Sequence, residues 1–194
     1  MNKSDVAAYF DRMAPDWDAH MVTDDAKLRL ILDTAGVQCG STVLDVACGT
    51  GVLFPYYLRR GVAHLTGVDL SAEMARIAAG KLHDPRVEVL CADIETLEVF
   101  RTFDCCVVYN AFPHFADPGA LLARLALWVR PGGRLTVAHG MSLEALHRHH
   151  AGSARAVSRE MLPPQELAAL AEPWFAVDVQ CADAEKYILS GVRR

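Results

Sequence analysis

The stretch VLDVACGTG, residues 43–51, combines a carboxylate with two closely spaced glycines at the end of an apolar run. Gly49 and Gly51 allow the backbone to turn tightly and to approach a ligand, and a helix after them would present its N-terminal amides. A dinucleotide-binding loop would need a third glycine where this sequence has Phe54. Asp45 would repel a pyrophosphate but attract an ammonium group or another positive charge. The loop therefore favours a small cationic ligand over a dinucleotide.

Two further acids follow the next two apolar runs. Asp69 stands in TGVDLS, 18 residues after Gly51, where a carboxylate typically accepts the two hydroxyls of a ribose. Asp93 stands in CADIETL, where it would read the exocyclic amine of an adenine. Three acids at the ends of three successive strands predict a nucleoside site.

Apolar runs of strand length alternate with longer segments of helical periodicity, which is typical of β-α units around a parallel sheet. Strands are predicted over 42–46, 64–68, 86–91, 104–109 and 133–139, and helices over 4–13, 24–35, 51–60, 72–82 and 117–129. Two helices within 142–172 precede a hairpin near 174–181 and 185–192, which puts an antiparallel strand at the sheet edge. The pattern predicts an α/β fold, a doubly wound and mostly parallel sheet of about seven strands, with ligands beyond the carboxyl ends of its central strands.

The length, charge and cysteine content of the chain exclude several classes of protein and disfavour others. The 194 residues, 52% of them hydrophobic, predict a single domain over 1–194. A net charge of −5 and scattered arginines disfavour a nucleic-acid partner. The six cysteines form no C-x-x-C, and the N-terminal segment MNKSDVAAYFDRM does not look like a signal peptide. No apolar stretch is long enough to span a membrane. We therefore expect a cytoplasmic protein with reduced cysteines.

On these motifs the chain resembles the class I S-adenosylmethionine-dependent methyltransferases, of the small-molecule type 11 or UbiE-like kind. The matching motifs, from about residue 40 to residue 140, are VLDVACGTG, GVDLS, CADIETL, FDCCVVYNAF and RPGGRLTV. The resemblance implies a Rossmann-like sheet of order 3-2-1-4-5-7-6 with strand 7 antiparallel. It also implies S-adenosylmethionine as cofactor and S-adenosylhomocysteine as product.

The resemblance also implies roles for individual residues. Asp45 and Gly49 would hold the methionine part of the cofactor, with Asn110 beside it. The segment YFDRMAPDWD is similar to one that closes over the cofactor in relatives, although ordinary packing of an amphipathic helix is the alternative. The full set of predicted cofactor-binding residues is Tyr9, Trp17, Asp45, Ala47, Gly49, Gly51, Asp69, Leu70, Met74, Asp93, Ile94 and Asn110. The expected organisation is an N-terminal lid over 1–36, a cofactor-binding core over 37–141, substrate-side helices over 142–172 and a C-terminal hairpin over 173–194.

Two histidines are candidates for a catalytic base. Transfer from a sulfonium is an in-line displacement, in which a hydroxyl acceptor usually needs a base or a metal and a thiol or amine needs only to lose a proton. His114, in YNAFPHF, and His139, in HGM, follow the fourth and fifth strands, and a near-neutral pKa suits a base. A buried core histidine bonded to a backbone carbonyl is the alternative for His139.

Other readings stay open at this stage. Glu144, His147 and His150 have spacings that would place pairs of them on one helix face, but a metal would need a further ligand, and no metal is predicted. The expected partner is a small-molecule acceptor with an O, N or S nucleophile. A nucleic-acid or protein methyltransferase with an N-P-P-Y type loop is an alternative, from which Asn110-Ala111-Phe112-Pro113 departs. A cofactor-binding regulator without catalysis is another. The sequence leaves open whether the protein is a monomer or a homodimer.

Overall fold

A seven-stranded sheet forms the centre of the computed structural model, which describes residues 1–150, 152 and 154–194, the side chain of His150 excepted. Its order is β3-β2-β1-β4-β5-β7-β6, as predicted. The strands are β1 (Thr42–Val46), β2 (His64–Asp69), β3 (Val87–Cys91), β4 (Phe103–Tyr109), β5 (Val129–His139), β6 (Phe175–Ala182) and β7 (Tyr187–Arg193). β1 to β5 pair in parallel, whereas β7 runs antiparallel to both β5 and β6.

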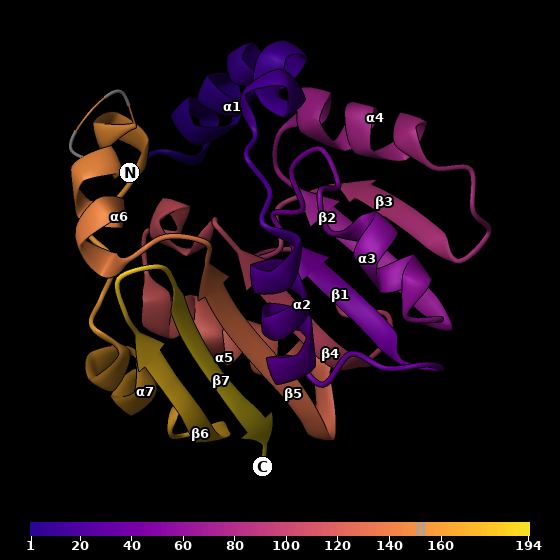
Figure 1. The fold of residues 1–194 in the computed structure, drawn as a ribbon, viewed down its shortest axis with the longest axis vertical. Helices are drawn as coiled ribbons and strands as arrows, with labels where there is room; N and C mark the ends of the chain where they lie inside the picture. The colour runs from indigo at the N-terminus through magenta and orange to yellow at the C-terminus, as the bar shows by residue number, and fades with distance from the viewer. Residues whose placement is uncertain (151, 153) are drawn as a thin grey trace.

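Helices cover both faces of this sheet (Figure 1). They are α1 (Lys3–Trp17), α2 (Asp25–Thr34), α3 (Phe54–Arg59), α4 (Ala72–Lys81), α5 (Pro118–Trp128), α6 (Leu143–His150) and α7 (Pro164–Ala171), with short 3₁₀ turns η1 (Asp18–His20), η2 (Phe112–His114) and η3 (Arg155–Val157). No helix among the described residues is long and apolar enough to cross a bilayer.

The two faces of the sheet carry separate hydrophobic cores, because successive strand side chains point to opposite sides. In β1, Leu44 and Val46 pack into the core beneath α5 and α7. Val43 packs into the core beneath α2 and α3. Asp45 has the same parity as Val43, so its carboxylate is directed to the α2 and α3 side.

Side-chain caps begin several of the helices where the sequence contains Asn, Asp or Ser. Asn2 caps α1, Asp24 caps α2, Ser71 caps α4 and Asp117 caps α5, each by accepting a backbone N–H. The caps at Ser71 and Asp117 fix the direction in which the chain leaves the loops after β2 and β4. These two loops are thereby held in place.

Three predicted boundaries differ from the structure by three or more residues. α1 continues past residue 13 to Trp17 with Pro15 inside it. The helix expected from residue 51 begins at Phe54, because Gly51 has a φ of +78° and the chain turns there. β5 begins at Val129 instead of 133 and carries a register shift against β4.

Candidate cofactor and acceptor cavity

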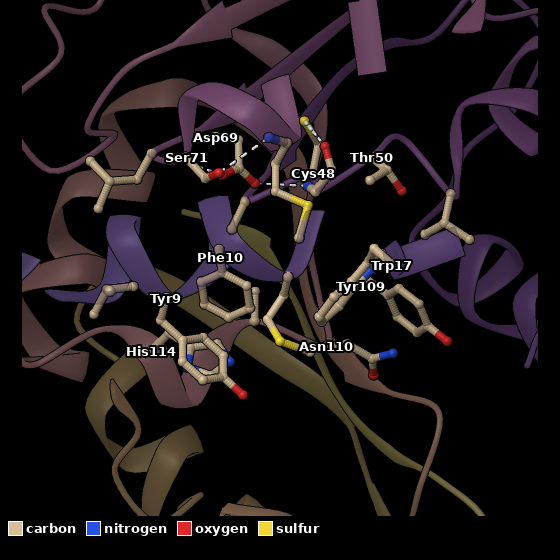
Figure 2. A pocket seen from close by; sticks show the side chains of 18 of the residues that line it. Tyr9, Phe10, Trp17, Cys48, Thr50, Asp69, Ser71, Tyr109, Asn110 and His114 are labelled. Atoms are coloured by element: carbon tan, nitrogen blue, oxygen red, sulfur yellow. Dashed lines mark hydrogen bonds between the residues drawn. The ribbon is translucent and has the colours of Figure 1, made fainter. Parts of the chain in front are cut away.

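A cavity of about 680 Å³ lies at the carboxyl ends of the central strands, beneath α1. Its wall on one side comes from the loops after β1, β2 and β3, and we call it the cofactor wall: Ala47, Cys48, Gly49, Thr50, Asp69, Leu70, Ser71, Met74, Asp93, Ile94 and Glu95. A second set, the acceptor wall, follows β4 and β5: His114, Phe115, His139, Met141, Leu146, His149 and Ala154. Figure 2 shows Asp69, Ser71 and Thr50 well apart from His114 in the view. The cavity thus has two chemically separate ends.

Asp69 joins the first two strand-end loops of the cofactor wall. Its Oδ2 accepts the amide of Gly49 at 2.7 Å and its Oδ1 accepts the amide of Ser71 at 2.8 Å. Gly49 has a φ of +55°, and a Cβ there would meet nothing within 4 Å, so the backbone itself faces open space. Each carboxylate oxygen retains a second lone pair. The arrangement leaves acceptors for a diol beside an exposed stretch of backbone.

Two buried carboxylates lie behind this loop and repel each other. Asp45 is 2% exposed and Asp69 9% exposed. Burial, and then the charge of Asp69, hold the pKa of Asp45 well above its usual range. Burial likewise raises the pKa of Asp69, against its backbone hydrogen bonds. A ligand with positive charge would relieve this strain, whereas a pyrophosphate would add to it.

The second glycine of the motif turns the chain, as predicted, and also leaves space for an aromatic ring. Gly51 does not line the cavity, and a Cβ on it would lie 2.8 Å from the ring of Phe54. The same ring would lie 2.6 Å from a Cβ on Gly67 of β2. The two glycines therefore make room for Phe54, the residue that stands where a dinucleotide-binding loop has glycine.

The residues predicted to surround the adenine all line the cavity, and the carboxylate of Asp93 is already engaged. Met74 and Ile94 are buried at 1% and 4% exposure, and Leu70 lies partly buried beside them. The Oδ2 of Asp93 accepts from Lys3 Nζ at 2.6 Å, and its Oδ1 accepts the amide of Glu95 at 3.0 Å. An adenine that contacted Asp93 would therefore share its carboxylate with Lys3 of α1.

Helix α1 forms the roof of the cavity and is tied to the cofactor wall by polar contacts. Asp11 accepts from Ser71 Oγ at 2.5 Å and from the amide of Glu73 at 3.1 Å. Asp18, directly after α1, accepts from Thr50 Oγ1 at 2.6 Å and pairs with Lys81 Nζ at 2.5 Å. With Lys3 on Asp93, the roof is joined to the loops after β1, β2 and β3.

The aromatic residues of the roof point into the cavity (Figure 2). Phe10 stands edge-on to Tyr9 at 5.2 Å between ring centroids and to Trp17 at 5.8 Å. It also meets the imidazole of His114 edge-on at 4.8 Å. Phe10 thus connects the roof with His114 of the acceptor wall.

Asn110 connects the ends of β4 and β5. It adopts a φ of +55°, its amide donates to the carbonyl of Ala138 at 2.9 Å, and its Oδ1 accepts the amide of Gly140 at 3.0 Å. A hydrogen bond from its side chain also lowers the pKa of the Tyr109 hydroxyl, although burial raises that pKa overall. The Asn110 side chain is therefore held in the framework while it lines the cavity.

His114 has a defined neutral tautomer. Its Nδ1 lies 2.9 Å from the carbonyl oxygen of Val157, which can only accept, so Nδ1 carries hydrogen and Nε2 carries the lone pair of the neutral ring. Ser158 Oγ lies 3.2 Å from the same Nδ1. Burial lowers the pKa of His114, and the neighbouring His149 lowers it further, against the bond to Val157. The ring stays neutral to lower pH than a free histidine does.

His139 lines the cavity from the end of β5, yet its side chain is 0% exposed. It pairs in register with Tyr187 of β7, and the two rings stand edge-on at 6.1 Å. His139 therefore lies in the core at the carboxyl end of β5. His114 instead lies on the 3₁₀ turn η2, against Phe10 of the roof. The Nδ1 of His114 is bonded to the Val157 carbonyl, and this bond fixes its ring.

The histidines of α6 serve different neighbours. His147 Nε2 lies 3.0 Å from the carbonyl oxygen of Met161, and Glu144 pairs with Arg148. His149 lines the cavity, while the side chain of His150 lies outside the described residues. Within the part of the chain that the structure describes, no three His, Cys, Asp or Glu residues are placed to hold a metal ion.

The structure brings together most of the predicted site. Ten of the twelve predicted cofactor-binding residues line the cavity, as do both candidate bases; Asp45 and Gly51 do not. Sequence reasoning missed Lys3, Asp11 and Asp18, which tie the roof down. The spacing of Asp11 and Asp18 was a possible signal, because residues seven positions apart along a helix lie on the same face.

Comparisons with known proteins agree with this geometry. Residues 43–133 match the sequence model of the family described as "Methyltransferase domain". The malonyl-[acyl-carrier protein] O-methyltransferase of Pseudescherichia vulneris is 33% identical over 179 residues, which are 90% of this chain and 70% of that protein. The ubiquinone biosynthesis O-methyltransferase of Rhodopseudomonas palustris (strain BisB18) is 37% identical over 103 residues, 51% of this chain and 39% of that protein.

Among solved structures, the N-methyltransferase NodS from Bradyrhizobium japonicum WM9, in complex with S-adenosyl-l-homocysteine, has a TM-score of 0.77 to this chain. The match covers 97% of this chain and 98% of that one at 14% identity, so it shows the same fold. The alignments to the ubiquinone biosynthesis O-methyltransferases span only 37% to 58% of those relatives.

Proposed function

We propose, from the premise that the chain belongs to the class I S-adenosylmethionine-dependent methyltransferases, that it methylates a small-molecule acceptor. S-adenosylmethionine supplies the electrophilic methyl group when bound. The chain's own residues have to hold that cofactor, exclude water and align the acceptor at near-attack distance.

The observation that carries the proposal is the pair of buried carboxylates at the sheet's switch point. Asp45 and Asp69 both have a raised pKa because they are poorly solvated, and S-adenosylmethionine brings an ammonium and a sulfonium. The backbone of Gly49 faces open space beside Asp69. The residues present therefore fit a positively charged nucleoside. We assign the ribose hydroxyls to Asp69 and the adenine to the surroundings of Leu70, Met74 and Ile94.

Asp45 acts on this site through charge instead of direct contact. It lies outside the cavity lining, on the α2 and α3 side of β1, where it also repels charge on Cys48. A cation bound nearby lowers the raised pKa of this carboxyl group, and the ionised carboxylate then acts over several ångströms in a medium of low dielectric constant. We propose that Asp45 favours the cationic cofactor from behind the glycine loop.

On the acceptor side we propose His114 as the general base. Its neutral tautomer, fixed by the Val157 carbonyl, puts the lone pair of the ring on Nε2, and Nε2 is the atom to which we assign proton transfer from the acceptor. His139, the second candidate, is buried against Tyr187 at the end of β5. We propose a positioning role for it.

An amino-methyltransferase with an N-P-P-Y type loop would use its asparagine oxygen to accept from the target amine. Here the Oδ1 of Asn110 already accepts from Gly140, and the next two residues, Ala111 and Phe112, depart from the motif. This favours a small-molecule acceptor over a nucleic acid or a protein. All six cysteines are free, and we infer a reducing, cytoplasmic setting.

The test is calorimetric titration with S-adenosylmethionine, S-adenosylhomocysteine and NAD, followed by pooled small acceptors and a labelled methyl group. We expect the protein to bind S-adenosylmethionine and S-adenosylhomocysteine and not to bind NAD. We also expect the labelled methyl group to appear on a small-molecule acceptor. Binding without any turnover would favour a regulator, and tight uptake of NAD alone would contradict the proposal. An undiminished rate after exhaustive chelation is also expected.

A further inference from the structure

The charged side chains of the cavity are divided unevenly between its two walls. The cofactor wall contains the carboxylates of Asp69, Asp93 and Glu95. The acceptor wall contains, among the residues that the structure describes, three histidines and no Asp, Glu, Lys or Arg. Its other members, Phe115, Met141, Leu146 and Ala154, are apolar.

The roof adds no free charge over the acceptor wall. Lys3 is the one lysine among the described lining residues, and its Nζ lies 2.6 Å from Asp93 and 2.8 Å from Glu95, both on the cofactor wall. Asp16, at the far end of α1, is exposed to solvent. On this side the roof presents the ring of Phe10, which meets His114 edge-on, and Val6, which packs with Ala154 and Val157. The acceptor end is therefore enclosed by apolar groups and imidazoles.

A charged acceptor would be poorly compensated there. Burying a carboxylate or an ammonium without a partner is strongly unfavourable, because the charge loses its hydration and gains no compensating interaction. An ammonium would find no carboxylate among the described residues of this wall. Within the described lining of this wall, a carboxylate or phosphate would meet only imidazoles, and burial lowers the pKa of His114. The ammonium of Lys27 lies outside the lining and donates to the Gly140 carbonyl at 3.0 Å.

We infer that the acceptor is an uncharged molecule whose nucleophile is a weakly acidic hydroxyl or thiol, selected by an acceptor wall without permanent charge. This inference rests on the proposed methyl transfer. The acceptor's proton passes to Nε2 of His114, the oxygen or sulfur forms a bond to the methyl carbon, and the carbon–sulfur bond of the donor breaks with its electron pair going to sulfur. The products are a methyl ether or thioether, S-adenosylhomocysteine and a proton that His114 returns to solvent.

Three probes with one ring test this selection: p-cresol, p-toluate and p-methylbenzylammonium. They are titrated calorimetrically, at neutral pH, into protein first saturated with S-adenosylhomocysteine. We expect p-cresol to bind about tenfold or more tightly than either ion. Equal or tighter binding of p-toluate or p-methylbenzylammonium overturns the inference. So does binding of none of the three, because this end of the cavity would then not be an acceptor site.

A charge introduced into the acceptor wall provides the matched test. Met141→Lys should shift the preference toward p-toluate, whereas Leu170→Lys, on the exposed surface of α7, should leave the order of the three probes unchanged. Circular dichroism confirms that each variant is folded, and the wild-type panel decides the matter if Met141→Lys does not fold. Failure to take up S-adenosylhomocysteine in the first step would instead contradict the proposed function, so the two failures are distinguishable.

Discussion

Asp45 is a single residue whose charge opposes folding and favours ligand binding. Because its pKa is raised in the folded state, the folded protein holds this proton more tightly than the unfolded chain does. The free energy of unfolding therefore falls as the pH rises above the ordinary aspartate value near 4. Two buried acids in one site destabilise the folded protein, and functional sites often keep such unfavourable arrangements.

We predict that Asp45→Asn stabilises the ligand-free protein at pH 7 by about 1–3 kcal/mol and weakens binding of S-adenosylmethionine by about tenfold or more. Urea unfolding at acidic and neutral pH should show that the gain grows with pH. Glu98→Gln, on an exposed loop, is the control of equal charge change. A variant that loses stability without losing affinity would contradict the assigned role.

His114 sets a pH dependence of activity. Its pKa is lowered by burial and by His149 of α6, while Phe10 of α1 and Ser158 after η3 face the same ring. A base must be neutral to act, so activity should rise with pH through a midpoint below the ordinary histidine value of about 6.5. With an acceptor found by the methyl-label screen, the kcat profile measures that midpoint.

We predict that His114→Gln lowers kcat by about 100-fold and abolishes the acid limb, with little change in the affinity for S-adenosylhomocysteine. His83→Gln, in the exposed loop after α4, should leave the profile as it is. An acid limb that survives in His114→Gln would assign the base elsewhere, with His139 the next candidate.

At the scale of elements, the packing of α3 against β2 depends on Gly67, the first residue of the GVDLS motif, for which no role was predicted from the sequence. Gly67→Ala would place a Cβ 2.6 Å from Phe54 and 2.9 Å from the Sγ of Cys48. We predict a loss of about 1–3 kcal/mol by urea unfolding, as for overpacked cores. Gly80→Ala, within α4 and with nothing within 4 Å of the new Cβ, should instead gain about 0.5–1 kcal/mol. Equal effects of the two substitutions would refute the steric argument.

The contacts of α1 make ligand affinity sensitive to salt. The Asp18 and Lys81 side chains are 46% and 34% exposed, so the pair itself is worth at most about 1 kcal/mol. We predict that Asp18→Asn raises the Kd of S-adenosylhomocysteine by about two- to fivefold at low salt, and less at high salt where the pair is screened. Glu73→Gln, whose side chain pairs with Arg76 on α4 itself, is the control. An unchanged Kd would mean that the roof is held by its apolar contacts alone.

Most elements could be predicted from sequence because their patterns are local. The apolar runs VLDVA and CCVVY and the caps at Ser71 and Asp117 specify strands and helix starts without long-range information. The start of β5 differs because it depends on strand pairing: Val129 becomes a strand residue because it pairs with Phe103 of β4. Contacts such as Lys3 with Asp93 join residues 90 positions apart, and nothing in the local pattern of either residue indicates the other.

At the scale of the whole molecule, the cavity closes only when the N-terminal helix, the sheet and α6 come together. The strand-end rule for parallel sheets was enough to collect Asp69, Asp93 and Asn110 in one place. It was not enough to decide what each side chain faces. Asp45 shows the difference: it stands at the predicted strand end, but the parity of β1 directs it behind the loop.

Global stability and opening of the roof can be separated with thiol chemistry. Cys106 lies in the core at 0% exposure, whereas Cys48, at 5%, lines the cavity. S-adenosylhomocysteine at about 100 times its Kd stabilises the folded state by about 2.7 kcal/mol, so it should slow alkylation of Cys106 about 100-fold. Mass spectrometry of the alkylated protein should show Cys48 reacting before Cys106 without ligand and losing that lead with ligand. Identical rates at both cysteines would mean that the roof opens only by global unfolding.

The ring of Phe54 has a consequence for attempts to redesign this chain. Since Gly51 and Gly67 both leave space for that ring, restoring the missing glycine by Phe54→Gly would open a hole in the interior and would not create a phosphate cradle. A conversion to nicotinamide chemistry would have to refill the hole and also neutralise Asp45, whereas Asp69 could stay, because an acid at that position accepts the ribose of a dinucleotide as well. A single substitution in the loop is therefore not enough to change the cofactor.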